Sequence, residues 1–216
     1  GDCSLRVLRG GSFASKAHFL PDLISRFRKV AVFHVESSRP HQLDYQVISS
    51  AADRLLEDPS ANFIFLHLPI PHPVGIYNRH TGQFADQDST YLDPLALADR
   101  YLAHARAVLE QNGPWDSYTV IVMGAHSWRT WLWKNNWGPE QQRATHGGEF
   151  DPRPAYIVKL PYQHQPVRID SPYAAIHTRA LLDAVVAGQI HSPAGLSAWT
   201  TQWKDGAGDK TNIAAR

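Results

Sequence analysis

Three short, almost wholly apolar segments stand out along the chain, at residues 62–68, 118–123 and 155–160. A proline follows the first and the third segment, and a glycine follows the second. Short apolar runs bounded by turn residues are typical of strands that are buried on both faces, as in a parallel sheet. The pattern therefore predicts three strands, and residues 31–35 suggest a further short one.

Between these segments, apolar residues recur every three or four positions, which predicts helices with one buried face. The stripes run through Leu43 and Val47 within residues 43–56, through Leu95 and Leu102 within residues 93–111, and along residues 177–186. Asp93 is expected to cap the second of these helices, with Pro94 at its first position. Gly188 is expected to end the third, and a shorter helix is expected over residues 21–30.

The alternation of strands and helices predicts an α/β fold with a largely parallel sheet flanked by helices. On this interpretation residues 1–60 are an N-terminal connector with helices, residues 61–203 carry the α/β domain portion, and residues 204–216 form a polar tail. The polar stretch at residues 69–90 is long for a connection within a compact domain, so it is a candidate functional loop.

Histidines lie where two of the predicted strands end. His67 and His72 accompany the end of the first strand, and His126 follows the second. Ligands of open α/β sheets bind at the carboxyl ends of the strands, so these side chains are expected to meet at one edge. Neutral imidazoles are common ligands of zinc and similar ions. A histidine at a strand end can equally be a hydrogen-bonded core or loop residue, and that alternative stays open.

The same segments resemble sulfatases and phosphoethanolamine transferases of the alkaline phosphatase superfamily. The resemblance covers, in the family's order, a strand running into a proline-flanked histidine (62–73), a Tyr-x-x…Asp helix (91–112), an element like D-x-T-x-hydrophobic run-S-D-H (115–127), a His-Gly…Arg-Pro stretch (145–161) and a closing helix (176–188). The order of several elements is stronger evidence than any one motif. The resemblance implies an alkaline-phosphatase-like domain and suggests that the chain is its C-terminal portion.

The resemblance also implies roles for four histidines. His126 and His146 would be ligands of a divalent metal, with zinc, calcium or manganese as candidates, and His72 and His67 would contact the oxygens of the substrate. The substrate would be a small-molecule or lipid-linked phosphate or sulfate ester, because metal ions and cationic donors stabilise the charge on such groups. The alternative for His146 is an exposed loop residue beside Gly147.

Pro94 departs from the family's usual pattern in the 91–112 helix, and two further departures count against activity. Ala125 stands where the family has an aspartate, and a methyl group cannot coordinate a cation. The family also carries its nucleophile and first acidic ligands in an N-terminal half that has no counterpart before residue 60, and Cys3 only faintly resembles a nucleophile motif. We therefore expect a sulfatase-like hydrolase or transferase that is impaired as a catalyst and has no catalytic residue of its own.

Two other interpretations remain open. The chain could be a non-catalytic domain of the same fold that binds an anion or a partner protein. Alternatively, a missing N-terminal half or a separate chain could supply the nucleophile.

Composition narrows the function classes further. Lys and Arg number 21 against 20 Asp and Glu, which gives a net charge of +1, so there is no basic excess of the kind that nucleic-acid binding requires. The single cysteine excludes a disulfide within the chain. Location is not indicated by the sequence itself, and the resemblance alone implies an extracytoplasmic or membrane-associated protein.

Overall fold

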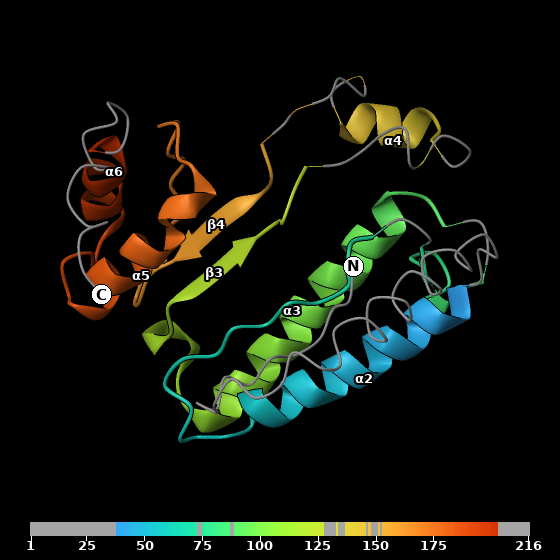
Figure 1. The fold of residues 1–216 in the computed structure, drawn as a ribbon, viewed down its shortest axis with the longest axis horizontal. Helices are drawn as coiled ribbons and strands as arrows, with labels where there is room; N and C mark the ends of the chain where they lie inside the picture. The colour runs from blue at the N-terminus through green and yellow to red at the C-terminus, as the bar shows by residue number, and fades with distance from the viewer. Residues whose placement is uncertain are drawn as a thin grey trace, which may run out of the picture. The chain divides into compact units, whose positions relative to one another are not determined.

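A computed structural model describes residues 38–72, 75–86, 89–127, 133, 137–145, 147, 151 and 153–202 (Figure 1). The helix expected at 21–30, the strand expected at 31–35 and the polar tail lie outside these residues. The chain divides into two compact units, one made of Gly1–Asn112 with Trp128–Pro152 and the other of Gly113–Ser127 with Arg153–Arg216. Among the described residues, no helix combines the length and the apolar character needed to cross a membrane.

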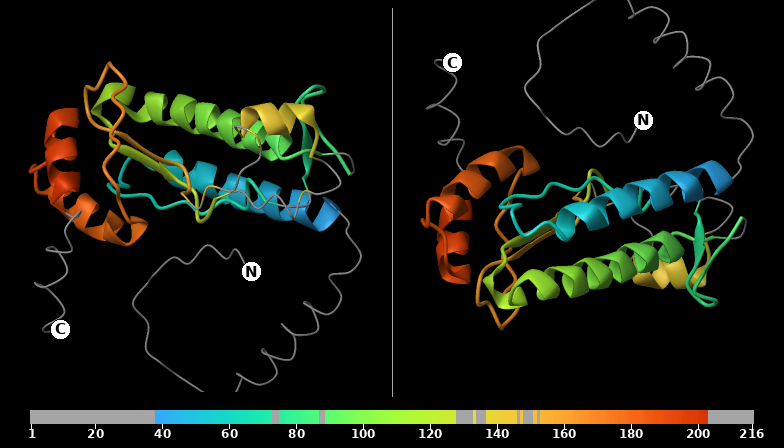
Figure 2. Two further views of the ribbon diagram at one scale, coloured as in Figure 1. Left: turned by 90° about the horizontal axis from the view of Figure 1, so that it is seen from above. Right: turned by 90° about the horizontal axis from the view of Figure 1, so that it is seen from below.

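Two long helices build the first unit. Helix α2 spans Ser38–Leu56 and helix α3 spans Leu92–Asn112, and Figure 2 shows them side by side. They run in the same direction, and their ends are joined by a hydrogen bond from the Asn112 side chain to the Leu56 carbonyl at 2.8 Å. The shared core consists of Tyr45, Ala52 and Leu56 from α2, Leu97, Tyr101, Ala105 and Val108 from α3, and Ile76 and Tyr77 from the loop between them.

The buried faces of these helices match the predicted stripes only in part. Ile48 and Ala105, which continue these stripes, are buried. Leu43 and Val47 are both 60% exposed, and Leu95 and Leu102 are also exposed. Tyr45 and Tyr101 lie in the core instead and meet edge to face with ring centroids 6.4 Å apart. A tyrosine ring buries more apolar area than an aliphatic side chain, so the aromatic positions decide which face of each helix packs inward.

The connection between α2 and α3 contains a small hairpin. Strand β1 (Tyr77–Asn78) pairs with β2 (Gln83–Phe84) in antiparallel register. The Asn78 side chain accepts hydrogen bonds from the N–H groups of His80 and Thr81 at 2.9 and 3.1 Å, which mimics a backbone turn. Gly82 then takes a φ of 71°, a left-handed conformation that other residues adopt only with strain.

Asp93 was expected to be the N-cap of α3 but lies within its first turn. The helix begins at Leu92, and the buried Asp93 carboxylate accepts bonds from the backbone N–H and the hydroxyl of Thr90 at 2.6 and 2.9 Å. Asp93 therefore supplies one half of a capping box, in which the acid satisfies an N–H group before the helix. Pro94 was expected at the first position of the helix and is instead its third residue, still within the first turn. A short helix, α4 (Pro139–Ala144), also belongs to this unit.

The second unit packs two helices beside a pair of strands. Strand β3 (Val120–Met123) and β4 (Tyr156–Lys159) pair antiparallel, with Val120 opposite Lys159. Turns of 3-10 helix lie at Trp115–Ser117 and Ala175–His177, followed by α5 (Thr178–Val186) and α6 (Pro193–Thr201). The core is made of Leu160, Leu181, Ala184, Ile190 and Leu196.

The outcome of the strand and helix predictions is mixed. The segments 118–123 and 155–160 contain strands, and α5 ends before Gly188, which has a φ of 69°. Helix α6 was not predicted, although Ser192 caps it by accepting a bond from the Gly195 N–H at 3.1 Å. Both described sheets are two-stranded and antiparallel, and the larger parallel sheet remains a prediction.

The segment 62–68 has no strand pairing and is buried on only one side. Ile64, Leu66 and Leu68 pack against the core of the first unit, whereas Phe63 and Phe65 are 66% and 71% exposed. The alternation is that of an extended chain with a side-chain period of two. The expectation of a strand buried on both faces is therefore wrong for the described structure, because the described residues pack against only one side of this segment.

Candidate functional site

His126 lies three residues beyond the end of β3, on an exposed turn. The turn is close to the start of β4: the Gly124 N–H donates to the Ala155 carbonyl at 2.9 Å. A β-carbon at Gly124 would lie 3.2 Å from the Cβ of Pro154 and 3.3 Å from the His126 carbonyl oxygen. Glycine therefore permits the close approach that brings residues 124–126 beside residues 154–155.

The His126 ring has a defined hydrogen-bonding state. Its Nδ1 lies 2.7 Å from the Ser127 carbonyl oxygen. A carbonyl oxygen can only accept, so Nδ1 carries a proton, and in the neutral ring Nε2 keeps its lone pair. Histidines that bind metals generally have this arrangement, with one ring nitrogen donating to a carbonyl or carboxylate and the other facing the ion. The exposed Nε2 can therefore act as one ligand of a metal.

Ala125 precedes this histidine on the same exposed turn. Its methyl group offers no lone pair, so the turn presents one nitrogen donor and no carboxylate. Among residues that the structure describes, no group of three or more His, Cys, Asp and Glu side chains is placed to hold a metal ion. The described residues thus fit one ligand of the implied divalent metal and do not complete a site.

The two expected substrate contacts lie in the first unit. His67 is exposed on the extended segment, and His72 stacks on His41 of α2 with ring centroids 6.0 Å apart and planes inclined by 28°. Burial has the largest effect on the pKa of His41 and lowers it, and the neighbouring His72 lowers it further. These two effects outweigh that of Asp44, which would raise this pKa. The sequence analysis did not single out His41, because its position in the first turn of a helix has no motif to mark it.

The prediction that these histidine side chains meet at one edge of a sheet is not tested by their positions. His67 and His72 belong to the first unit and His126 to the second, and His146 lies outside the described residues. The structure does bring His72 together with His41 and places His126 beside the start of β4. A metal centre shared by His126 and His146 remains a prediction.

A hollow of about 330 Å³ lies elsewhere in the first unit, and none of the four predicted histidines lines it. Tyr45, Ser49 and Asp53 line it from α2, at a spacing of four residues. Leu97, Tyr101 and His104 line it from α3, at spacings of four and three. These spacings place each set on one helix face. Polar and aromatic residues at core-facing helix positions could have indicated this hollow, and the sequence analysis missed them.

The comparisons with known proteins find no relative. No family model, no curated protein and no solved structure matches this chain.

Proposed function

We propose that this chain is a sulfatase-like domain of the alkaline phosphatase superfamily, a lineage that hydrolyses or transfers phosphate or sulfate esters, and that Ala125 impairs it as a metalloenzyme. One observation carries the proposal: the imidazole that follows the apolar strand β3 donates through Nδ1 to a backbone carbonyl at 2.7 Å, which leaves Nε2 of this exposed residue able to bind a metal. The order of the sequence motifs around it supports the same interpretation.

In this proposal His126 would hold a divalent ion through Nε2, and His146 would be a second ligand. The ion would polarise the ester and offset the charge that develops on the transferred group. The described residues contribute one ligand to such a centre, so we assign no catalytic step to this chain. Its own contribution is to orient the His126 ring, because the Ser127 carbonyl holds the Nδ1 proton.

Restoring the carboxylate tests the assignment. In an Ala125→Asp variant, the carboxylate should join His126 as an oxygen ligand, and zinc should bind about tenfold more tightly or better than to the natural sequence. Isothermal titration calorimetry measures the affinity for zinc. An Ala125→Asp/His126→Ala double variant should lose the gain, and His191→Ala, which removes an exposed histidine near α6, should leave it unchanged. If the single variant binds zinc no better than the natural sequence, His126 is not a ligand.

Activity assays separate the substrate classes. Aryl phosphate and aryl sulfate esters, each tested with the natural chain and the Ala125→Asp variant in zinc, calcium or manganese, would reveal any turnover. We expect none from the natural chain, because its metal centre lacks the carboxylate. Turnover by the natural chain that does not depend on His126 would contradict the proposed metal chemistry.

The second candidate function is a non-catalytic domain that binds an anion or a partner protein. The stacked pair of His41 and His72 favours it, since two imidazoles 6.0 Å apart can donate hydrogen bonds to one anion when they are protonated. Titration with inorganic phosphate at pH 5, where both rings are more fully protonated than at neutral pH, tests this when it is followed by the NMR signals of the two rings. A His72→Ala variant should then lose binding, whereas His191→Ala should retain it.

A further inference from the structure

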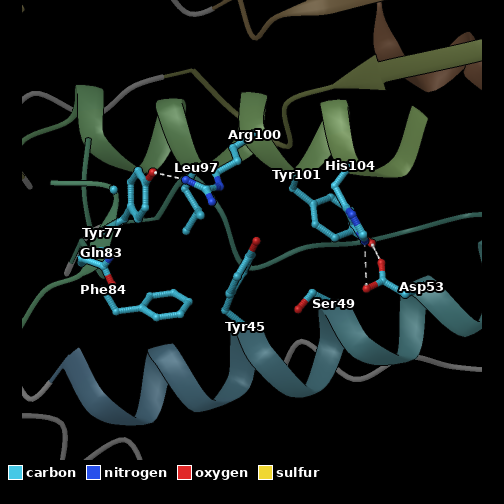
Figure 3. Close-up of a pocket in the computed structure, with 11 residues that line it drawn as sticks. Tyr45, Ser49, Asp53, Tyr77, Gln83, Phe84, Leu97, Arg100, Tyr101 and His104 are labelled. Atoms are coloured by element: carbon cyan, nitrogen blue, oxygen red, sulfur yellow. Dashed lines mark hydrogen bonds and ion pairs between the residues drawn. The ribbon is translucent and has the colours of Figure 1, made fainter. Parts of the chain in front are cut away.

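The hollow between α2 and α3 has the size and the walls of a small-molecule site. Its volume of about 330 Å³ lies at the lower end of the range for ligand pockets. We call it the tyrosine pocket, after Tyr45, Tyr77 and Tyr101, which line it together with Phe84, Asp53 and Arg100 (Figure 3). All of these residues belong to the first unit.

The aromatic walls are held by contacts among themselves. Tyr45 meets Phe84 edge to face at 5.9 Å and meets Tyr101 in the same way at 6.4 Å. Edge-to-face contacts are the favoured geometry for aromatic pairs, so the three rings support one another. The pocket is therefore walled by aromatic surface that is positioned before any ligand arrives.

Two charged groups of opposite sign also line the pocket, and both are oriented by neighbours. The Asp53 carboxylate accepts from the Tyr101 hydroxyl at 3.2 Å and pairs with His104 Nε2 at 3.2 Å. The Arg100 guanidinium donates to the Tyr77 hydroxyl at 3.3 Å and keeps further N–H groups. Together the two groups leave this part of the lining without net charge and offer one acceptor and one donor, so it fits a ligand that has no net charge and both donates and accepts hydrogen bonds.

The Tyr45 hydroxyl is a hydrogen-bonding group of the pocket that the described residues leave available. Tyr45 is only 8% exposed, and its ring rises from α2 towards α3 (Figure 3). Its hydroxyl forms no hydrogen bond with the residues that the structure describes, whereas the hydroxyls of Tyr77 and Tyr101 each have a partner. Burial and the Asp53 carboxylate raise the pKa of Tyr45, so the hydroxyl stays protonated and able to donate.

We propose that the tyrosine pocket binds a small neutral polyhydroxylated ligand, of the class of a single pyranose sugar. Such a ring has an apolar face of C–H groups that can lie on Tyr45, Phe84 or Tyr101, and hydroxyls that both donate and accept. Asp53 accepts from a ligand hydroxyl, Arg100 donates to another, and Tyr45 supplies the remaining bond. The site uses none of the residues proposed for ester chemistry, so it does not depend on that function.

Saturation-transfer NMR with the full chain tests the proposal, using D-glucose, D-galactose and N-acetyl-D-glucosamine as probes. At least one sugar should give a saturable signal, and Tyr45→Phe should weaken it by about tenfold because the ring stays and only the hydroxyl is lost. Asp53→Asn, which keeps the shape of the side chain, should weaken it similarly. The matched control is Tyr162→Phe, at an exposed tyrosine of the second unit, which should bind as the natural chain does.

Charged probes decide the ligand class. Tetramethylammonium and benzoate have apolar surface and a single charge each, and both should bind more weakly than the best sugar. The proposal is overturned if no sugar binds, if a charged probe binds better, or if Tyr45→Phe and Asp53→Asn both leave the affinity unchanged. Circular dichroism establishes that each variant is folded, and Asp53→Asn decides the matter alone if Tyr45→Phe does not fold.

Discussion

Replacing Asp93 by alanine should destabilise the protein by about 3 kcal/mol, the lower end of the range for breaking a buried ion pair. The carboxylate is 5% exposed and the Arg79 side chain 17% exposed. Asp93 accepts from the Arg79 N–H and guanidinium at 3.0 and 3.2 Å, as well as from Thr90. Its loss would leave these donors without their acceptor. The estimate stays at the lower end because Arg79 keeps a second partner, Glu140.

Urea unfolding followed by far-UV circular dichroism measures this loss. With an m value of about 2 kcal/mol/M, a loss of about 3 kcal/mol lowers the unfolding midpoint by about 1.5 M. The matched control is Glu110→Ala on the same helix, which removes an exposed i,i+4 pair with Arg106. The control should cost no more than about 0.5 kcal/mol. An Asp93→Ala midpoint equal to that of the control would refute the view that the buried network stabilises the start of α3.

Two further predictions concern pH and the second core. Burial by itself would raise the pKa of Asp93, but the bonds from Arg79 and Thr90 and the charge of Arg79 outweigh it and lower that pKa. As the pH falls, the Asp93 carboxyl therefore becomes protonated in the unfolded chain before it does so in the folded chain. Stability should fall as the pH drops below about 4, and the decline measured by urea titration should be smaller in Asp93→Asn. In the second unit, Leu181→Ala removes a side chain that is 1% exposed and should cost about 3 kcal/mol of stability in the same assay. The control is Val186→Ala at an exposed position, which should change stability by less than about 0.5 kcal/mol. Similar losses in the two variants would contradict the assignment of Leu181 to the core.

Local sequence signals predicted the elements whose causes are themselves local. The apolar runs at 118–123 and 155–160 contain β3 and β4, and Gly188 follows the end of α5. Turn residues and apolar periodicity act within a few positions of the chain, so they can be interpreted without knowledge of the partner. The missed helix α6 had such signals too, with Ser192 as its cap and Pro193 in its first turn.

The candidate site could be predicted only in part, because most of its contacts join residues that are far apart in the sequence. The sequence alone placed His126 after a strand, but the tautomer that frees Nε2 depends on the position of the Ser127 carbonyl. The pairing of Asp53 with His104 joins two helices that are 51 positions apart at these residues, and the contact of His41 with His72 joins a helix to a loop. No motif marks such contacts, because the two partners have no fixed spacing.

The sequence by itself determined the positions of β3 and β4 and the end of α5, the near balance of charge, and the absence of a carboxylate at position 125. The tertiary structure decided which faces are buried. It placed Tyr45 and Tyr101 in the core while Leu43 and Leu102 face solvent, and it buried one side of residues 62–68. The physical reason is that propensity and capping energies arise within one turn of the chain, whereas burial depends on what another segment brings to the same place.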